Sequence, residues 1–142
     1  MKIVFLDIDG VMNNFTSRNF KDVFSDKSCE NLNHILRELP EVQLVLSSSW
    51  RYKGLEYVKE VFHKNGIDKS RLVDMTEKGN GLRGVQIQDW LDKHKEVEHF
   101  VAIDDETQDM GNLANHVIKV NGFIGLTMKE VTQAIQHLKD KK

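Results

Sequence analysis

Two carboxylates stand one residue apart, directly after an apolar run near the start of the chain. Residues 3–6 are apolar and rich in β-branched and aromatic side chains, which is typical of a strand buried on both faces of a parallel sheet. Asp7 and Asp9 follow, and then Gly10. Neighbouring acids repel each other unless a cation or a shared proton lies between them, and a glycine lets the backbone turn sharply and approach a ligand closely.

Two further predicted strands also end in polar residues. The apolar run 42–46 is followed by Ser47, and the run 99–103 is followed by Asp104 and Asp105. The carboxyl ends of parallel strands lie at one edge of a sheet, where open α/β folds bind ligands, so we expect these residues to gather there with the first acid pair. An Asp-x-Asp pair alone would indicate a solvated turn, but polar groups at three strand ends favour a functional site.

These residue types favour phosphoryl chemistry. Carboxylates without a Cys/His cluster select Mg²⁺. Asp7 can act as nucleophile, because aspartate forms phosphoryl-enzyme intermediates. Asp9 can protonate the leaving oxygen and later take a proton from water. Ser47 can donate a hydrogen bond to the phosphoryl group, and a cationic side chain should complete the charge clamp.

Helices must position these strand ends, and the chain has amphipathic segments between its apolar runs. Ser28 is the expected N-cap of the first helix, and Pro40 follows its end. The predicted helices are residues 28–39, residues 54–65, a segment that begins at Arg83 or Gly84, and a last helix that opens with the capping box 127–130.

The connecting segments are short. We expect a short third strand at 71–73, a loop at 74–82 and an edge strand at 117–120. The segment 12–27 is predicted to be a loop that packs back through its aromatic residues, which are Phe15, Phe20 and Phe24. Alternating strands and helices predict an α/β fold, with a three-layer Rossmann-like parallel sheet covered by helices on both faces.

Composition narrows the possibilities further. The chain has 142 residues, of which 39% are hydrophobic and 30% charged, so a single domain spanning residues 1–142 is the default. The net charge of -2 argues against a broad surface for nucleic acid but not against a local basic patch. Cys29 is the single cysteine, and its helical position indicates a buried thiol. No signal peptide or membrane-spanning run is visible, so the expected location is cytoplasmic, without a membrane partner.

The motifs resemble those of a known family. Asp7-Ile8-Asp9-Gly10-Val11, Ser47 after an apolar strand, and Ile103-Asp104-Asp105 are similar, in this order, to motifs I, II and IV of the haloacid dehalogenase-like (HAD) phosphohydrolases. The string Leu46-Ser47-Ser48-Ser49-Trp50-Arg51 and the later Arg83-Gly84 resemble a small subgroup, the HAD domain found beside RNA-repair modules. The resemblance covers nearly the whole chain.

This resemblance implies roles for particular residues. Asp7 would be the nucleophile and Asp9 the acid/base, with the Asp9 backbone carbonyl also reaching the metal. Phosphate binding would fall to Ser47, Ser48 and Arg83, where Arg83 stands for motif III and Lys78 is the second choice. Val11 occupies a position where many of these phosphatases have threonine. The implied cofactor is Mg²⁺, and its ligands would be Asp7, Asp9, Asp104 and Asp105, with the direct ligand of the last pair left open.

The resemblance also bears on the substrate. HAD enzymes for small metabolites usually carry an inserted cap, and the segments 12–27 and 74–82 are too short for one. An open site suits a phosphate on a large molecule, such as a nucleic acid end or a protein, or a lid supplied by a partner. We predict a Mg²⁺-dependent phosphatase that acts through an aspartyl-phosphate on nucleic acid ends or nucleotides. The outer contacts expected for a polynucleotide are Arg18, Trp50, Arg51 and Lys53.

Several alternatives stay open at this stage. The main one is a catalytically weak HAD-like module that binds phosphorylated ends or a protein partner. A phospho-acceptor receiver domain also uses acids and a metal, but its phosphorylated aspartate ends a middle strand. The Gly-x-Gly-x-x-Gly match at 79–84 lacks the long preceding strand of a dinucleotide site. Trp90 is expected in the core, whereas Trp50 is either core or a base-stacking platform, and Arg51 either faces the phosphate or pairs with a surface acid.

Overall fold

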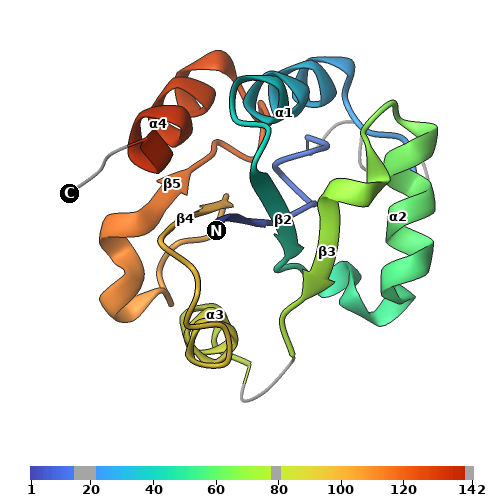
Figure 1. Cartoon of the computed structure of the whole chain (residues 1–142). Helices are drawn as coiled ribbons and strands as arrows, with labels where there is room; N and C mark the ends of the chain where they lie inside the picture. Colours follow the sequence, from blue (N-terminus) through green and yellow to red (C-terminus); the bar gives the residue numbers. More distant parts are fainter. Residues whose placement is uncertain (15–21, 78–80, 140–142) are drawn as a thin grey trace.

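The structure is a computed structural model, and it describes residues 1–14, 22–77 and 81–139. Its centre is a parallel sheet with the strand order β3-β2-β1-β4-β5 (Figure 1). This confirms the predicted α/β class. The strands are β1 (Lys2–Leu6), β2 (Val42–Leu46), β3 (Leu72–Met75), β4 (His99–Asp104) and β5 (Val117–Lys119).

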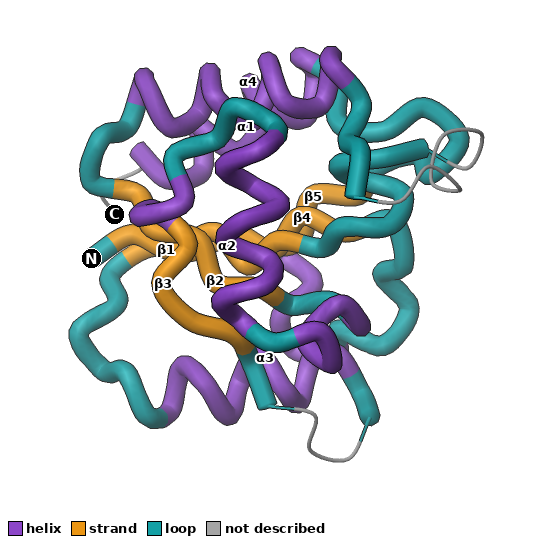
Figure 2. The backbone as a smooth tube through the Cα atoms, turned by 90° about the vertical axis from the view of Figure 1, so that its right-hand side faces the viewer, coloured by secondary structure: helices purple, strands orange, loops and turns teal. Residues whose placement is uncertain are grey.

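Helices cover both faces of this sheet. In Figures 1 and 2 the helices α1 and α4 lie on one side of the strands and α3 lies on the other. The helices are α1 (Asp26–Glu38), α2 (Leu55–Lys64), α3 (Arg83–Asp92) and α4 (Met128–Lys139), and the short 3₁₀ helices are η1 (Ser49–Lys53), η2 (Lys69–Arg71) and η3 (Gly111–His116). No helix among the described residues is long and apolar enough to cross a membrane.

The central strand β1 is buried on both faces, as its apolar sequence predicts. Val4 and Leu6 belong to the larger hydrophobic cluster, which also contains the inward side chains of α1, α2 and α4. Ile3 and Phe5 belong to the smaller cluster, which α3 and η3 complete. Because both faces are covered, only the ends of β1 can present polar groups to a ligand.

The order of the strands identifies where a ligand can enter. The chain moves from β1 to β2 to β3 in one direction and then returns to place β4 on the other side of β1. In open α/β sheets the crevice for ligands lies at such a reversal, outside the carboxyl ends of the strands. Here that point is the junction between β1 and β4.

Several predicted boundaries needed correction. The N-cap of α1 is Ser25, whose side chain accepts a hydrogen bond from the Ser28 amide, so the helix begins before the predicted Ser28. The Ser28 hydroxyl is buried and donates to the Val11 carbonyl at 2.8 Å. Serine is a favourable residue at both positions, and only the tertiary contact with the segment after β1 distinguishes them.

The third strand also differs from the prediction. It comprises Leu72–Met75, so Asp74 lies in the strand and not in the predicted loop. The Trp90 indole donates a hydrogen bond to the Asp74 carboxylate at 2.8 Å. This bond gives the partly buried carboxylate a partner, so an aspartate is tolerated in the strand. Arg71 precedes the strand and donates to carbonyl oxygens of Val42 and Leu39.

The remaining helix signals agree with the structure. The helix α3 begins at Arg83, and α4 begins after Thr127, whose amide donates to the Glu130 carboxylate at 2.7 Å. The predicted aromatic packing holds for Phe24, which is 3% exposed and contacts Trp50. Residues 15–21 lie outside the described part of the chain, and so do Phe15, Arg18 and Phe20.

Candidate active site at the carboxyl ends of the strands

Strand register brings the predicted residues together at one edge of the sheet. Leu6 of β1 pairs with Leu46 of β2 and with Ile103 of β4. The next residues therefore emerge side by side, and the Asp7 amide still donates to the Ile103 carbonyl at 3.1 Å. On the other flank the Ser47 amide donates to the Leu6 carbonyl at 2.9 Å.

Three carboxylates form a cluster at this edge. Asp7, Asp104 and Asp105 each offer an oxygen, and these oxygens lie within 4.8 Å of one another. Opposite ligands of Mg²⁺ are about 4.2 Å apart, so small side-chain rotations would bring all three to a single ion. Asp7 and Asp104 are buried, at 6% and 3% exposure. An all-oxygen set of this kind fits Mg²⁺.

Gly10 makes this cluster possible. Its φ angle is +88°, a conformation that other residues rarely adopt, and a Cβ built there would lie 2.3 Å from an Asp105 carboxylate oxygen. The Gly10 amide donates to the Asn13 side chain at 2.9 Å, which holds the turn. A glycine at this position therefore lets the turn after β1 approach Asp105 closely.

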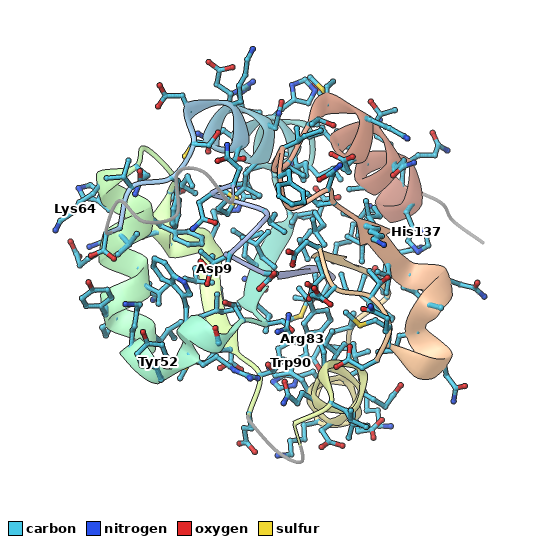
Figure 3. All side chains as sticks on the ribbon, turned by 180° about the vertical axis from the view of Figure 1, so that it is seen from behind. Asp9, Tyr52, Lys64, Arg83, Trp90 and His137 are labelled. Carbon is cyan, nitrogen blue, oxygen red and sulfur yellow. The ribbon has the colours of Figure 1, made fainter. Side chains whose placement is uncertain are left out.

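Asp9 lies apart from the three clustered carboxylates. Its carboxylate accepts hydrogen bonds from the Asn13 side-chain amide at 3.1 Å and from the Trp50 indole at 3.2 Å. Figure 3 labels Asp9 near the centre of its view, on the same side of the molecule as Arg83. Among the described residues, the side chain of Asp9 is not one of the group that could share a metal ion, so the structure brings together three of the four predicted ligands by their side chains.

Arg83 is the cation of the cluster. Its guanidinium lies 3.5 Å from an Asp7 oxygen and also forms an ion pair with Asp104. The start of α3 is fixed against the segment after β4, because the Arg83 amide donates to the Asp109 carboxylate at 2.8 Å. The competing motif III residue, Lys78, lies outside the described residues. Arg83 thus lies beside Asp7 and Asp104, and its assignment to motif III stays a prediction.

Burial dominates the electrostatics of the acids. Desolvation, followed by the charge of Asp104, raises the pKa of Asp7 to about 9, although Arg83 opposes this shift. Burial also raises the pKa of Asp104, again against the effect of Arg83. Both shifts have the sign expected of clustered acids without enough positive charge. A divalent cation bound between them would favour the ionised forms.

The two predicted phosphate-binding serines have different environments. The Ser47 hydroxyl is buried and has no hydrogen-bond partner among the residues that the structure describes. A buried polar atom of this kind usually has a hydrogen-bond partner, and a phosphate oxygen of a ligand could accept a hydrogen bond from this hydroxyl. The Ser48 hydroxyl instead caps η1 by accepting from the Trp50 amide at 3.1 Å. This bond uses the hydroxyl oxygen as an acceptor and does not occupy its proton, so the phosphate contact predicted for Ser48 stays a prediction.

Among the described residues, Arg51 bonds to neutral side chains and forms no ion pair with a surface acid, and its predicted contact with the phosphate stays a prediction. Its guanidinium donates to the Thr76 hydroxyl at 2.8 Å and to the Gln86 side-chain carbonyl at 2.7 Å. These bonds connect η1 to the segment after β3 and to α3. Burial and the charge of Arg83 lower the pKa of Arg51, so the second arginine lies within electrostatic reach of the first.

The sequence did not reveal that Trp50 and Asn13 donate hydrogen bonds to Asp9. Trp50 is 9% exposed, so the alternative of a base-stacking platform is wrong for this residue. Its indole is instead a hydrogen-bond donor to Asp9. Trp90 is a core residue, as predicted, and its ring lies edge-on to Phe5. The position of Trp50 directly after the Ser47–Ser49 string was the one available signal.

The described residues of the glycine-rich segment, 81–84, use two of their amides within the protein. The amides of Arg83 and Gly84, which would face a phosphate, donate to Asp109 instead. A Cβ on Gly84 would lie 2.6 Å from the Met110 carbonyl, so this glycine serves close packing. Gly79 and Asn80 lie outside the described residues.

Cys29 is not part of the site. It lies in α1 and is 9% exposed. Burial, followed by the charge of Asp26, raises the pKa of its thiol to about 11. A protonated, buried thiol is a poor nucleophile, which confirms the predicted buried thiol.

Comparison with known proteins agrees with this geometry. A protein-family model described as "HAD domain in Swiss Army Knife RNA repair proteins" matches residues 3–131. This match includes all three clustered aspartates, Ser47 and Arg83. A search of curated proteins found no match. With nearly the whole chain covered by the family, a parallel α/β sheet and acids at the expected strand ends, this protein belongs to the HAD domains of Swiss Army Knife RNA repair proteins.

Proposed function

We propose that this protein is a Mg²⁺-dependent phosphatase that hydrolyses phosphoric monoesters. The main support is the position of Asp7, which lies between acids that could bind a metal ion and a serine that could bind a phosphate. On one side are the carboxylates of Asp104 and Asp105, within 4.8 Å. On the other is the strand end of Ser47, whose buried hydroxyl lacks a partner among the described residues. A phosphate bound there would receive a nucleophile, a hydrogen-bond donor and a neutralising cation.

The proposed reaction has two steps. In the first, an Asp7 oxygen attacks phosphorus, the bond to the leaving alcohol breaks, and Asp9 donates a proton to that alcohol. In the second, Asp9 takes a proton from water, which attacks the aspartyl-phosphate and releases inorganic phosphate. The Trp50 and Asn13 hydrogen bonds orient Asp9 for both transfers. Arg83 and the Ser47 hydroxyl stabilise the charge on the phosphoryl oxygens.

The acid cluster would hold Mg²⁺ through Asp7, Asp104 and Asp105. The Asp9 backbone carbonyl stays the predicted fourth protein ligand. When bound, the ion supplies positive charge for the phosphoryl oxygens and keeps Asp7 ionised. The chain's own contribution is to keep these three acids close despite their repulsion, through Gly10 and Arg83.

We propose a terminal phosphate on nucleic acid as the substrate. The family to which this chain belongs is named for RNA repair proteins. The segments 7–25 and 76–82, which join β1 to α1 and β3 to α3, are also too short to fold as a separate cap domain, which supports an open site for a large substrate. With little chain available to surround a small molecule, most additional binding energy must come from contacts outside the phosphate pocket.

Hydrolysis of p-nitrophenyl phosphate with Mg²⁺ tests the reaction itself. We expect Asp7→Asn to abolish turnover with an unchanged circular dichroism spectrum, because an amide cannot form the acyl phosphate. Asp9→Asn should lower kcat by about 10²-fold, the usual scale for a positioned acid/base. The exposed Asp89→Asn variant on α3 is the matched control and should keep full activity.

Two outcomes would contradict the proposal in different ways. Full activity in Asp7→Asn would remove Asp7 from the reaction. A wild-type protein that binds phosphorylated oligonucleotides but hydrolyses neither them nor p-nitrophenyl phosphate would support the alternative, a module that only recognises phosphorylated ends.

A further inference from the structure

A cluster of aromatic rings surrounds one lysine on η1, immediately beside the candidate site. The ammonium group of Lys53 lies 4.8 Å from the ring centre of Trp50, 5.1 Å from that of Tyr52 and 5.3 Å from that of Tyr57. All three distances are within the range of cation–π attraction. We call these four residues the η1 aromatic patch.

The three rings of the patch are not equally available. Trp50 is 9% exposed and is held by Asp9. Tyr57 is 38% exposed, and its hydroxyl donates to the Asp22 carboxylate. Tyr52 is 75% exposed, and Figure 3 labels it away from the centre, on the side of Asp9. Tyr52 is therefore the ring with most area left for a partner.

The patch is continuous with the proposed phosphate pocket. It begins on the segment that leaves β2, directly after Ser47 and Ser48. A 3₁₀ helix rises about 2 Å per residue, so Tyr52 lies roughly 8 Å along η1 from Ser48. Stacked nucleotides advance about 3.4 Å each along a strand. The Trp50 indole also joins the patch to the site through its bond to Asp9. On this scale, the second or third nucleotide of an end held at Asp7 is the one that matches the spacing to Tyr52.

The chemistry of the patch matches a single strand. Aromatic rings stack on any base, and a lysine beside them can contact the phosphate backbone. Three acids near these rings have hydrogen-bond or ion-pair partners, since Asp9 accepts from Trp50, Asp22 accepts from Tyr57, and Glu56 lies 4.0 Å from Lys59. The net charge of -2 leaves little general attraction for nucleic acid, so recognition must depend on a local combination of this kind.

We propose that Tyr52 and Lys53 form a subsite for the second or third nucleotide of a single-stranded polynucleotide. Tyr52 stacks on the base, and Lys53 binds a phosphate of the backbone. This inference rests on the proposed function, because it assumes that the terminal phosphate lies at Asp7. It assigns the preference for a polymer to two side chains outside the reacting centre.

A length series measures this subsite. Substrates are mononucleotides and tetranucleotides with a 3′- or a 5′-phosphate, and p-nitrophenyl phosphate reports the reaction alone. We expect Tyr52→Leu to lower kcat/KM for the preferred tetranucleotide about tenfold or more. The same variant should leave kcat/KM unchanged for the mononucleotide and for p-nitrophenyl phosphate. Tyr52→Phe keeps the ring and should behave like the wild type.

Lys53 is tested by its salt dependence. We expect Lys53→Met to weaken tetranucleotide hydrolysis and to reduce the slope of log(kcat/KM) against log[salt] by about one. Lys64→Met removes the same charge at the far end of α2 and should leave that slope unchanged. Figure 3 labels Lys64 well away from Arg83.

Binding separates this inference from the catalytic proposal. Fluorescence anisotropy with a labelled, phosphorylated tetranucleotide is measured on Asp7→Asn alone and combined with Tyr52→Leu. A raised Kd in the double variant supports the subsite even if the wild type proves inactive. Equal effects of Tyr52→Leu on mononucleotide and tetranucleotide, together with an unchanged Kd, would overturn it and leave this surface to a protein partner.

Discussion

Burial raises the pKa of Asp7 to about 9 from an ordinary value of 3.8, and this has a direct consequence for stability. Between these two pH values the unfolded chain has an ionised Asp7, whereas the metal-free folded protein keeps the proton. The folded state therefore binds more protons, and stability falls as pH rises.

The first prediction follows at the level of this residue. In EDTA, the melting temperature of the wild type should fall between pH 5 and pH 9, and Asp7→Asn should show a shallower decline. At pH 9 the variant should melt several degrees higher, since about 1 kcal/mol shifts the melting temperature of a domain of this size by ~2–4 °C. Differential scanning calorimetry gives both profiles. The Asp89→Asn control should follow the wild type, and parallel profiles for all three proteins would contradict the raised pKa.

Individual site residues differed in how well the sequence predicted them. Asp7 and Ser47 each follow a strand directly and Asp104 is the last residue of β4, so the parallel sheet alone brings them together. The sequence did not predict the direction of the Asp9 carboxylate, because that direction depends on the turn, where Asn13 and Trp50 both donate hydrogen bonds to it. Asn13 is a neighbour in the chain, but Trp50 is distant in sequence, and no local pattern contains that contact.

At the level of elements, the turn after β1 and the segment after β4 depend on each other. Gly10 has a φ of +88°, and a Cβ there would meet Asp105 at 2.3 Å. Any side chain would therefore displace Asp105 from the acid cluster as well as straining the backbone. The turn thus contributes to the metal site because the missing side chain of Gly10 leaves space for the Asp105 carboxylate.

The second prediction is that Gly10→Ala weakens Mg²⁺ binding more than it weakens the fold. Gly66→Ala is the matched control, because Gly66 has a φ of +80° and nothing within 4 Å of the added Cβ. Both variants should lose stability from backbone strain, by about 1 kcal/mol. Only Gly10→Ala should lose Mg²⁺ affinity, by tenfold or more, in isothermal titration calorimetry. Equal affinities in the two variants would show that Asp105 does not need this space.

Element boundaries were predictable where a local signal had one interpretation. The capping box at Thr127 and the apolar spacing of β2 both gave correct elements. The start of α1 was wrong because Ser25 and Ser28 are both good caps, and the choice depends on a contact with Val11. The end of β3 was wrong because Asp74 reads as a loop residue until Trp90 supplies its hydrogen bond.

At the level of the whole molecule, the order of the strands in the sheet could not be predicted from the sequence pattern. Alternating strands and helices predict a parallel sheet, but many orders satisfy that pattern. The observed order puts β1 between β2 and β4. This arrangement gives Asp7 neighbours on both sides, with Ser47 on one and Asp104 on the other. The chemistry of the site is therefore a property of the topology as well as of the residues.

The last prediction concerns Mg²⁺ and the stability of the folded protein. An ion that binds only the folded state stabilises it by about 2.7 kcal/mol at a hundred times its Kd, so the melting temperature should rise by roughly 5–10 °C. EDTA should reverse the gain. Binding must remove the proton from Asp7, whose pKa is raised to about 9, so the gain should be larger at pH 8 than at pH 6.

Variants of the neighbouring acids distinguish a metal ligand from an ion-pair partner. Asp104 forms an ion pair with the partly buried Arg83, so Asp104→Asn should lower the melting temperature even in EDTA. Asp105 packs against Gly10 and has no ion pair with a cation among the described residues. Asp105→Asn should therefore melt like the wild type in EDTA and yet lose most of the gain from Mg²⁺. If Mg²⁺ does not change the melting temperature of the wild type at either pH, the proposed metal site is wrong, because an ion bound by these three acids must stabilise the folded state.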